Sequence, residues 1–586
     1  MKKLIILLSL LHSGILFSAV TNTNGVPSFR AIGPDPSCHF DTSNGASLQD
    51  ALNSGDYELR LVNNSSHAGP FTTIGEVYLR GGYDNCTDAL SDTQGTNPSV
   101  LDADFIDSVI TLSVNGNYIL ENIKIINGSA NEGGGLNLTA TDMTVKLDRV
   151  IIENNQALNG AGISKTEENN NVNLTIVDSI IQNNTTLGLG FGGGIYFRGI
   201  GEVIVYGNTL FTENEAQYGG ALYLRNTNAT FVVGDNPTID SGMRNNRARD
   251  HGAAIYTDSS TVEITGGLKN IPGIGIQGLS GRNYLILGNT ADSDNDSVGL
   301  GGAMMLYRQS NTTLNAISMV DNHGYVGGGI YLYQLSELNI GFPENSDCQT
   351  TTLNGCNFFI NNTATTTGGA IHSHNSTANL KSINFNGNRA NEGTVLVSQG
   401  STINLSSSVL YNNGDSGNNG FLDKYALGTF SSSDLNIEHV TAVKNKTVDS
   451  FILASNGPNL LNSYNNYFYN PLSGPWLEEF GGSVTVVNHD CQIVDETNNI
   501  NDSTHNLVTT NAFFNDTQYF IDEANNDYHL LNTSNLIDFV GTNCPENLNL
   551  INNNRDIDNQ PRTDFTDLGA DENLTNDIIF DNGFEN

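Results

Sequence analysis

The sequence predicts an all-β protein, a single solenoid of stacked parallel strands (a parallel β-helix) with about 12 rungs, an N-terminal helical cap and a C-terminal cap. Three observations predict this fold. A Gly-rich motif recurs between residues 133 and 395. A motif with an apolar residue, two variable residues and Asn precedes many of its copies. Short stretches of alternating polar and apolar residues connect the two motifs, which is the pattern of strands rather than helices.

The Gly-rich motif marks one turn in each rung. Glycine adopts positive φ without the penalty that a Cβ would impose, so the chain can change direction sharply at each copy. The good copies are Gly133–Leu136, Gly160–Ile163, Gly192–Ile195, Gly219–Leu222, Gly252–Ile255, Gly301–Met304, Gly327–Ile330 and Gly368–Ile371, and Glu392–Val395 is a degenerate copy.

The Asn motif marks a second turn. Asn tolerates left-handed backbone, and amides stacked from rung to rung can bond to one another and to the turn backbone. The alternating stretch Val172–Val177 is typical of the strands between the turns. Such short strands cannot bury an apolar face alone, so we expect each rung to stack on the next. Copies include Ile152–Asn155, Phe211–Asn214, Met319–Asn322, Phe359–Asn362, Phe385–Asn388 and Leu410–Asn413.

The repeats divide the chain into segments. Residues 1–19 are predicted to be a signal peptide, because Lys2 and Lys3 precede an apolar run that ends near Ala19. An N-terminal membrane anchor is the alternative, although the apolar run is short for a span. Residues 20–110 form the N-terminal cap and first coils, with a short helix at Leu48–Leu52 and a strand at Tyr57–Val62. Residues 111–475 contain the β-helix repeats, and residues 476–575 form C-terminal coils and a cap.

Over residues 100–475 the paired motifs resemble the repeats of chlamydial-type polymorphic outer-membrane proteins. More broadly, they are similar to the right-handed parallel β-helix of the pectin-lyase-like superfamily. The resemblance implies a right-handed solenoid in an exported protein, in the medium or on the outer-membrane surface of a Gram-negative bacterium. It says less about function, because this fold carries many functions.

The C-terminal region carries a second resemblance. Asp527–Leu530, Ser534–Asp538, Arg555–Arg562 and Asp567–Glu572 are similar to the C-terminal module of the choice-of-anchor group of secreted β-helix proteins. The resemblance assigns structural roles to Arg562, Asp567, Gly569 and Glu572. We expect Arg562 to pair with Glu572, with a catalytic couple as the alternative. Residues 576–586 form an acidic tail similar to I-F-x-x-G-F-E tails of exported proteins, either a sorting signal or a frayed end.

Six cysteines suggest disulfide bonds in an exported chain. Proximity along the chain favours the pairs Cys38–Cys86, Cys348–Cys356 and Cys491–Cys544, although six cysteines allow 15 pairings. Zinc binding is the alternative, but no two cysteines have the spacing C-x2-C.

The charge balance excludes one class of partner. The chain has 62 acidic and 24 basic residues, a formal net charge of −38. A nucleic-acid-binding protein needs a basic face, so we expect no nucleic-acid partner. Outside the signal peptide, the chain has no apolar run long enough for a transmembrane helix. High charge also resists association, so we expect a monomer.

No catalytic residue is assigned. Glycoside hydrolysis needs a pair of carboxylates, and we find no pair that rung alignment brings to one face. His251 follows Asp250 within a Gly-rich turn, which explains it adequately without catalysis. Arg244, Arg247, Arg249 and Arg282 could dock an acidic polysaccharide, but solvated turn positions explain them as well.

One acidic loop is a candidate metal site. Asp292, Asp294 and Asp296 alternate along a short segment, and carboxylates at this spacing can converge on a hard cation such as calcium. Ser297 stands where an EF-hand loop has Gly, so the loop is not an EF-hand. The alternative is an exposed acidic loop without an ion. Calcium is therefore the candidate cofactor, and no other cofactor is expected.

Two function classes follow. The first is a non-catalytic surface or secreted protein for adhesion or interaction, with a glycan or a host or cell-surface ligand as its partner. The second is a polysaccharide-active lyase or glycoside hydrolase. A convergent set of carboxylates and a basic residue on one face would favour the enzyme. A pure spacer differs from the first class only by lacking a ligand.

Overall fold

The computed structural model describes residues 29–494 apart from residues 64–65, 235–240, 268, 273, 278–281, 342–356, 416–419, 470–475 and 481–485. Beyond residue 494 it describes only residues 507–508, 520–522, 527–530, 556, 567 and 569–570. The predicted signal peptide and the acidic tail lie outside the described residues. None of the described helices is long and apolar enough to cross a membrane.

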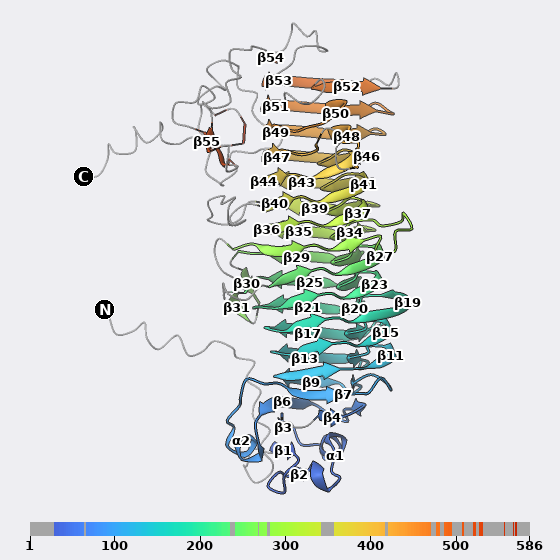
Figure 1. Cartoon of the computed structure of the whole chain (residues 1–586), viewed down its shortest axis with the longest axis vertical. Helices are drawn as coiled ribbons and strands as arrows, with labels where there is room; N and C mark the ends of the chain where they lie inside the picture. The colour runs from blue at the N-terminus through green and yellow to red at the C-terminus, as the bar shows by residue number, and fades with distance from the viewer. Residues whose placement is uncertain are drawn as a thin grey trace, which may run out of the picture. The chain divides into compact units, whose positions relative to one another are not determined.

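The chain forms two compact units. Unit 1 comprises Met1–Ala248, Ala253–Tyr256 and Ser260–Leu279, and unit 2 comprises Arg249–Gly252, Thr257–Ser259 and Ser280–Asn586. Within each unit, parallel strands from successive turns of the chain lie side by side (Figure 1). The predicted all-β parallel solenoid is therefore confirmed.

The strands belong to three walls, which we number in the order in which a turn visits them. In the described part of the chain, the first wall is a 29-stranded sheet, the second a 9-stranded sheet and the third a 14-stranded sheet. Each turn crosses the third wall once, so there are about 14 turns and the predicted 12 is too low. The first and last turns, such as the turn that contains β48 (Tyr425–Phe430), lack the Gly-rich motif. A count of turns based on this motif therefore leaves them out.

Unit 1 contributes strands to all three walls. In the first wall these are β6 (Val77–Tyr83), β7 (Ser99–Asp102), β9 (Gly116–Glu121), β10 (Ile123–Ile126), β13 (Asp142–Asp148), β14 (Ile151–Glu153), β17 (Asn171–Val177), β18 (Ile180–Gln182), β21 (Gly201–Tyr206), β22 (Leu210–Thr212), β25 (Asn228–Val232), β26 (Gly242–Arg244) and β29 (Thr261–Thr265). The second wall has β11 (Ser129–Glu132), β15 (Gln156–Asn159), β19 (Thr185–Phe191), β23 (Glu215–Tyr218) and β27 (Arg247–His251), which ends in unit 2. The third wall has β5 (Phe71–Thr72), β8 (Ile110–Leu112), β12 (Leu136–Leu138), β16 (Ile163–Lys165), β20 (Ile195–Arg198), β24 (Leu222–Arg225) and β28 (Ile255–Asp258), which also ends in unit 2.

Unit 2 repeats this plan. Its first wall has β32 (Tyr284–Leu287), β35 (Asn311–Asn315), β36 (Ile317–Val320), β39 (Glu337–Ile340), β40 (Asn357–Ile360), β43 (Thr377–Lys381), β44 (Ile383–Asn386), β47 (Thr402–Tyr411), β49 (Asp434–Val443), β51 (Leu460–Tyr469), β53 (Val486–Val494) and β54 (Leu507–Val508). Its second wall has β33 (Thr290–Ala291), β37 (His323–Val326), β41 (Thr363–Thr367) and β45 (Arg389–Glu392). Its third wall has β34 (Met304–Tyr307), β38 (Ile330–Tyr333), β42 (Ile371–His374), β46 (Leu396–Gln399), β48, β50 (Ser450–Ser455) and β52 (Leu477–Phe480).

The N-terminal cap contains the expected helix, α1 (Leu48–Asn53), which Ser47 and Asp50 close with a reciprocal capping box. Leu48 and Leu52 are buried and, with Leu79 of β6, line a small interior space. The helix therefore covers apolar side chains of the first coils. The cap also contains η1 (Thr42–Asn44) and α2 (Cys86–Ser91). Its strands β1 (Phe29–Gly33), β2 (Phe40–Asp41), β3 (Glu58–Val62) and β4 (Ser66–Ala68) are the remaining four strands of the first wall.

Among the described residues, two antiparallel pairs of strands lie outside the walls. They are β30 (Lys269–Ile271) with β31 (Gly275–Gln277), and β55 (Phe520–Asp522) with β56 (Asp527–Leu530).

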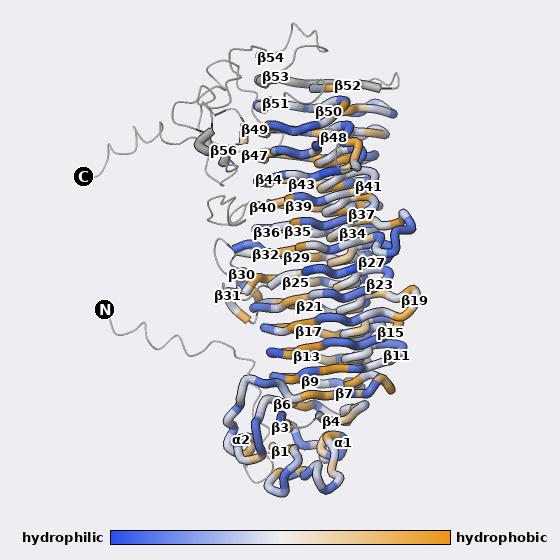
Figure 2. Tube along the Cα trace, viewed as in Figure 1, coloured by the Kyte–Doolittle hydropathy of each residue, from blue (hydrophilic) through white to orange (hydrophobic). Residues whose placement is uncertain are grey.

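Side chains along each strand point alternately into the core and outward. In β38, Ile330 and Leu332 have no exposed surface and face the interior, so Tyr331 and Tyr333 belong to the opposite face. The same alternation appears as short apolar and polar bands along the strands of each unit (Figure 2). The walls therefore present mostly polar side chains outward around a narrow apolar core.

The Asn motif forms a ladder of buried amides. In unit 2, Asn322 Nδ2 donates to Asn362 Oδ1 at 2.9 Å, and Asn362 Nδ2 donates to Asn388 Oδ1 at 3.1 Å. The ladder extends to Asn413 and Asn445, and unit 1 has its own ladder through residues 155, 184, 214 and 246. Each amide also bonds to turn backbone, as expected from the sequence. The residue before each ladder Asn is often left-handed, as Asn361 is with φ 52°.

Two physical requirements explain the glycines of the Gly-rich motif. The first glycine of a copy, such as Gly192 with φ 63°, takes a left-handed conformation, and a Cβ there would also collide with the carbonyl oxygen of Ile195 in the same copy. The second glycine has little room: a Cβ on Gly193 would collide with the carbonyl oxygens of Gly220 and Glu215 in the next turn. The motif therefore combines a tight turn with a close approach of successive backbones.

Candidate functional site

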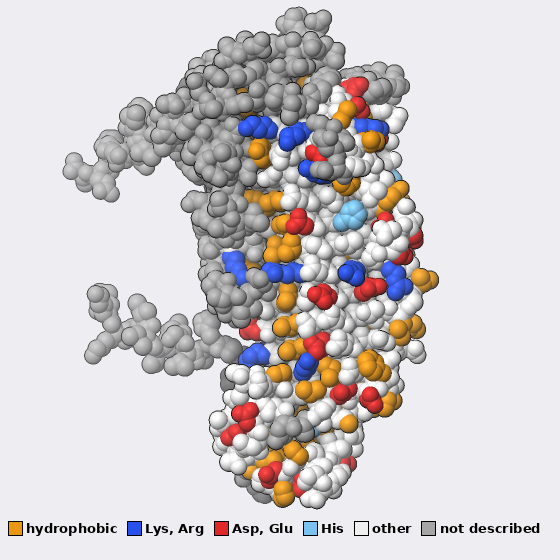
Figure 3. All heavy atoms as spheres, in the orientation of Figure 1, with side chains coloured by type: hydrophobic (Ala, Val, Ile, Leu, Met, Phe, Trp, Pro, Cys, Tyr) orange, Lys and Arg blue, Asp and Glu red, His pale blue; other side chains and the backbone are white. Residues whose placement is uncertain are grey.

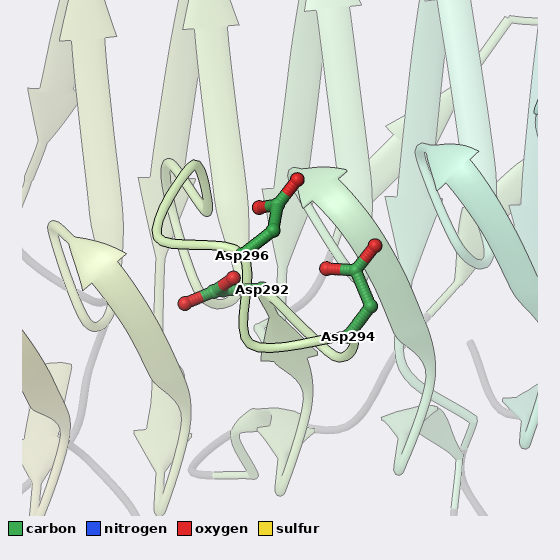
Figure 4. A group of neighbouring side chains, drawn as sticks. All are labelled: Asp292, Asp294 and Asp296. Atoms are coloured by element: carbon green, nitrogen blue, oxygen red, sulfur yellow. The ribbon is translucent and has the colours of Figure 1, made fainter.

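The acidic loop brings its three carboxylates together. One oxygen each from Asp292, Asp294 and Asp296 lies within 4.8 Å of the others (Figure 4). The loop follows β33 and is shaped by hydrogen bonds from Ser297 N to Asp292 Oδ1 at 3.0 Å and from Val298 N to Asp296 Oδ1 at 3.1 Å. Asp292 is buried, whereas Asp294 and Asp296 are exposed.

The carboxylates of this loop repel one another. Desolvation raises the pKa of Asp296, and the negative charges of Asp294, Asp250 and Asp292 raise it further. A hard cation would relieve this repulsion, and an all-oxygen donor set suits calcium. These three residues therefore fit a calcium ion, with backbone carbonyls or water completing its coordination.

An open groove of about 1050 Å³ lies in unit 2, where the third wall turns into the first wall. Its lining comes from successive turns and is mostly uncharged: Ser259, Arg308, Gln309, Gln334, Leu335, Ser336, Glu337, Asn375, Ser376, Thr377, Gly400 and Thr402. The side chains of Gln309, Gln334 and Asn375 are exposed. The groove therefore presents amides and hydroxyls to solvent.

An aromatic column borders this groove. Tyr307, Tyr333 and His374 immediately precede lining residues and occupy paired positions on β34, β38 and β42. The ring centroids of Tyr307 and Tyr333 lie 5.8 Å apart, and those of Tyr333 and His374 lie 5.0 Å apart. All three side chains are half-buried.

The two charged lining residues have partners within unit 2. Arg308 Nη1 lies 3.8 Å from Asp258 Oδ2, and its guanidinium lies 4.6 Å from the centre of the Tyr307 ring. Glu337 Oε1 accepts a hydrogen bond from Asn339 Nδ2 at 3.0 Å. With one cation and one anion in its lining, the groove carries no net charge. On the face shown in Figure 3, charged side chains are likewise scattered among uncharged ones.

A second acidic group lies between β47 and β48. Burial raises the pKa of Asp423 to about 7, and the side-chain hydrogen bond and charge of Asp415 raise it further, whereas the backbone N–H of Asp415 and the charge of Arg389 lower it. Arg389 forms an ion pair with Asp415. Asp423 has no exposed surface, so a substrate has no access to this carboxyl group. This cluster is therefore structural.

The other predicted site residues fall in different places. Cys38 and Cys86 form a disulfide bond in the N-terminal cap, beside the buried residues Val62 and Tyr83. Cys348, Cys356 and Cys544 lie outside the described residues, and Cys491 is placed only as part of β53. His251 Nδ1 accepts a hydrogen bond from Leu300 N at 3.3 Å, which gives this ring a structural role in unit 2.

The C-terminal module is described only in part. Asp567 and Ala570 are buried. Gly569 N donates to Asn465 O at 3.1 Å, and Ala570 N donates to Thr441 Oγ1 at 3.0 Å, so this segment lies against β49 and β51. Arg562 and Glu572 lie outside the described residues, and their pairing remains a prediction.

Sequence reasoning missed the groove and the Asp415–Asp423 cluster. The groove residues follow the third-wall strands. Serine recurs at Ser336 and Ser376 and threonine at Thr377 and Thr402, but the exposed positions between them carry no repeated letter. An alignment of the turns by their Gly-rich motifs would have placed Tyr307, Tyr333 and His374 in one column.

One comparison with known families gives a match. Residues 358–374 match the repeat of Chlamydia polymorphic membrane proteins. The matched segment begins within β40 and includes the ladder residue Asn362, β41, the Gly368–Gly369 turn and β42. No curated protein matches the chain. The protein is thus a parallel β-solenoid in which one segment is similar to the repeat of Chlamydia polymorphic membrane proteins.

Proposed function

We propose that the protein is exported and acts at the bacterial surface or in the medium, by non-catalytic recognition in adhesion or interaction. The observation that carries this proposal is the family match, because the repeat belongs to a family of membrane proteins and the match ends at His374, beside the open groove. The mostly uncharged, solvent-facing lining of that groove supports recognition rather than bond cleavage.

Bead adhesion tests the function directly. Beads coated with the purified chain lacking residues 1–19 are expected to bind cultured cells or extracellular matrix saturably, with inhibition by excess soluble protein. Beads coated with heat-unfolded protein are the control. Antibody labelling of intact producing cells, compared with permeabilised cells, tests the location. Absence of saturable binding to any surface would contradict adhesion.

The polysaccharide-active enzyme remains the competing function. Incubation of the purified chain with uronates and neutral glycans is expected to release neither unsaturated products nor new reducing ends. Sustained turnover of any member of this panel would replace the proposal by an enzymatic function.

A further inference from the structure

The groove of unit 2 combines exposed amides with a bordering column of aromatic rings. We propose that it binds an uncharged polysaccharide whose chain runs in the direction in which the turns stack. This inference rests on the proposed function, because it names the ligand class for non-catalytic recognition.

Backbone hydrogen bonds fix the spacing of the turns that carry these amides. Gln309 N donates to Gln334 O at 2.9 Å, and Leu335 N donates to Asn375 O at 2.7 Å, so the backbone of each turn is bonded to the next. Successive turns of such a stack are about 4.8 Å apart. This repeat is comparable to the length of one pyranose unit. Each amide offers donors and an acceptor, which complement the hydroxyl groups of a sugar.

The aromatic column supplies the second kind of contact. Tyr307, Tyr333 and His374 form a continuous series of rings, with centroid distances of 5.8 and 5.0 Å. Because the planes of Tyr307 and Tyr333 are only 14° apart, their faces are stacked on each other, and the column presents apolar ring edges beside polar tips. A pyranose ring also has an apolar face of C–H groups and a polar rim. Rings and amides together therefore match both sides of a sugar.

The balance of charged side chains in the groove favours an uncharged ligand. Arg308 is balanced by Asp258, and Glu337 is the anion of the lining. A polyuronate needs several cations to offset its repeated carboxylates, and the groove offers one arginine. The formal net charge of −38 adds long-range repulsion toward any polyanion.

An extended peptide fits less well. Peptides bind sheets by adding a strand to a free edge. Here the backbone groups of the turns bond to neighbouring turns, as Gly400 N does to Phe430 O at 3.0 Å. Leu335, 71% exposed, is the only large apolar side chain among the lining residues. The groove thus lacks the apolar pockets that anchor peptide side chains.

Isothermal titration calorimetry on the full mature chain tests the inference. The probes are cello-, manno- and chito-oligosaccharides from disaccharide to hexasaccharide, with oligogalacturonates and an unrelated peptide library as competitors. At least one neutral series is expected to bind, with affinity that rises with length. Gln334→Ala is expected to weaken binding ~3–10-fold, the contribution of about one hydrogen bond. Tyr333→Ala is expected to weaken it further.

The control is Asn226→Ala in unit 1, since Asn226 is also an exposed turn residue with left-handed backbone, φ 53°. This variant is expected to bind like wild type, and thermal melting confirms that all variants fold. The inference is overturned if no neutral series binds, if oligogalacturonates or peptides bind more tightly, or if Gln334→Ala and Tyr333→Ala leave affinity unchanged. If coated beads still adhere to cells in those cases, the proposed function survives without this ligand.

Discussion

The backbone N–H of Asp415 donates to Oδ2 of Asp423 across 2.9 Å, within a buried cluster that Arg389 joins through its ion pair with Asp415. The pKa of Asp423, raised to about 7, lies well above the usual value for aspartate, and burial is the main cause. The folded chain therefore holds a proton at this carboxyl group over a pH range in which the unfolded chain has lost it.

This proton makes stability depend on pH. Between about pH 4 and pH 7 the folded state binds more protons than the unfolded state, so this group lowers the free energy of unfolding as pH rises. Asp423→Asn cannot ionise, and we expect it to gain on the order of 1–3 kcal/mol over wild type at pH 7.5 but little at pH 4. Urea unfolding of both proteins at the two pH values measures the difference. An equal difference at both values would contradict the raised pKa.

The asparagine ladder predicts a large cost for losing one buried amide. Asn362→Ala leaves Met319 O and Asn322 N, which bond to the amide at 2.9 and 3.2 Å, without this partner. We expect a loss of about 2–4 kcal/mol. Asn379→Ala is the matched control, because Asn379 is half-buried and bonds only in an outer row of amides, to Asn339 and Asn404. Its cost should stay below about 1 kcal/mol. Similar denaturant midpoints for the two variants would count against the ladder.

The two causes of glycine in the repeat predict different costs. Gly193→Ala places a Cβ against the backbone of the next turn, and we expect a loss of about 2–4 kcal/mol. Gly188 has φ 64°, but a Cβ added there would meet no atom within 4 Å, so Gly188→Ala should cost about 1 kcal/mol of backbone strain. Chemical denaturation ranks the two variants. Gly188 lies outside the motif and tests conformation alone, so the reverse order would contradict close approach as the reason for the second glycine.

The acidic loop predicts a response to calcium. Calcium at ten times its Kd is expected to stabilise the chain by about 1.4 kcal/mol, and a chelator should reverse the shift. Asp292→Asn and Asp294→Asn should lose the response, because each removes one of the converging carboxylates. Asp104→Asn, at an exposed turn of unit 1, should keep it. If calorimetry at millimolar calcium shows neither heat of binding nor a change in melting temperature, the prediction of a calcium site is wrong.

The repeating backbone requirements were predictable because they are local. Gly192 and Asn362 belong to short motifs whose residue types report a tight turn and a stacked amide. The acidic loop was found for the same reason, since its three carboxylates are neighbours in sequence. Helix α2 was not expected, although Asn85 caps it and accepts from Asp88 N.

The groove was not predictable in the same way. Tyr333 and His374 become neighbours only because their turns pair in register, although the chain between them is much longer than an ordinary repeat. The Asp415–Asp423 contact likewise depends on burial, which neither residue type indicates. Burial and the register between turns depend on the whole stack of turns, so no single sequence motif predicts them.

The asparagine ladder also bears on how such a chain can change over evolutionary time. Asn388 and Asn413 are 25 residues apart, whereas Asn322 and Asn362 are 40 residues apart, yet both steps are bridged by one amide hydrogen bond. A length difference between turns is therefore absorbed outside the ladder, and the register of the walls is unaffected. Insertions at these turns can diversify one part of the protein's surface while the remaining turns keep their pairing.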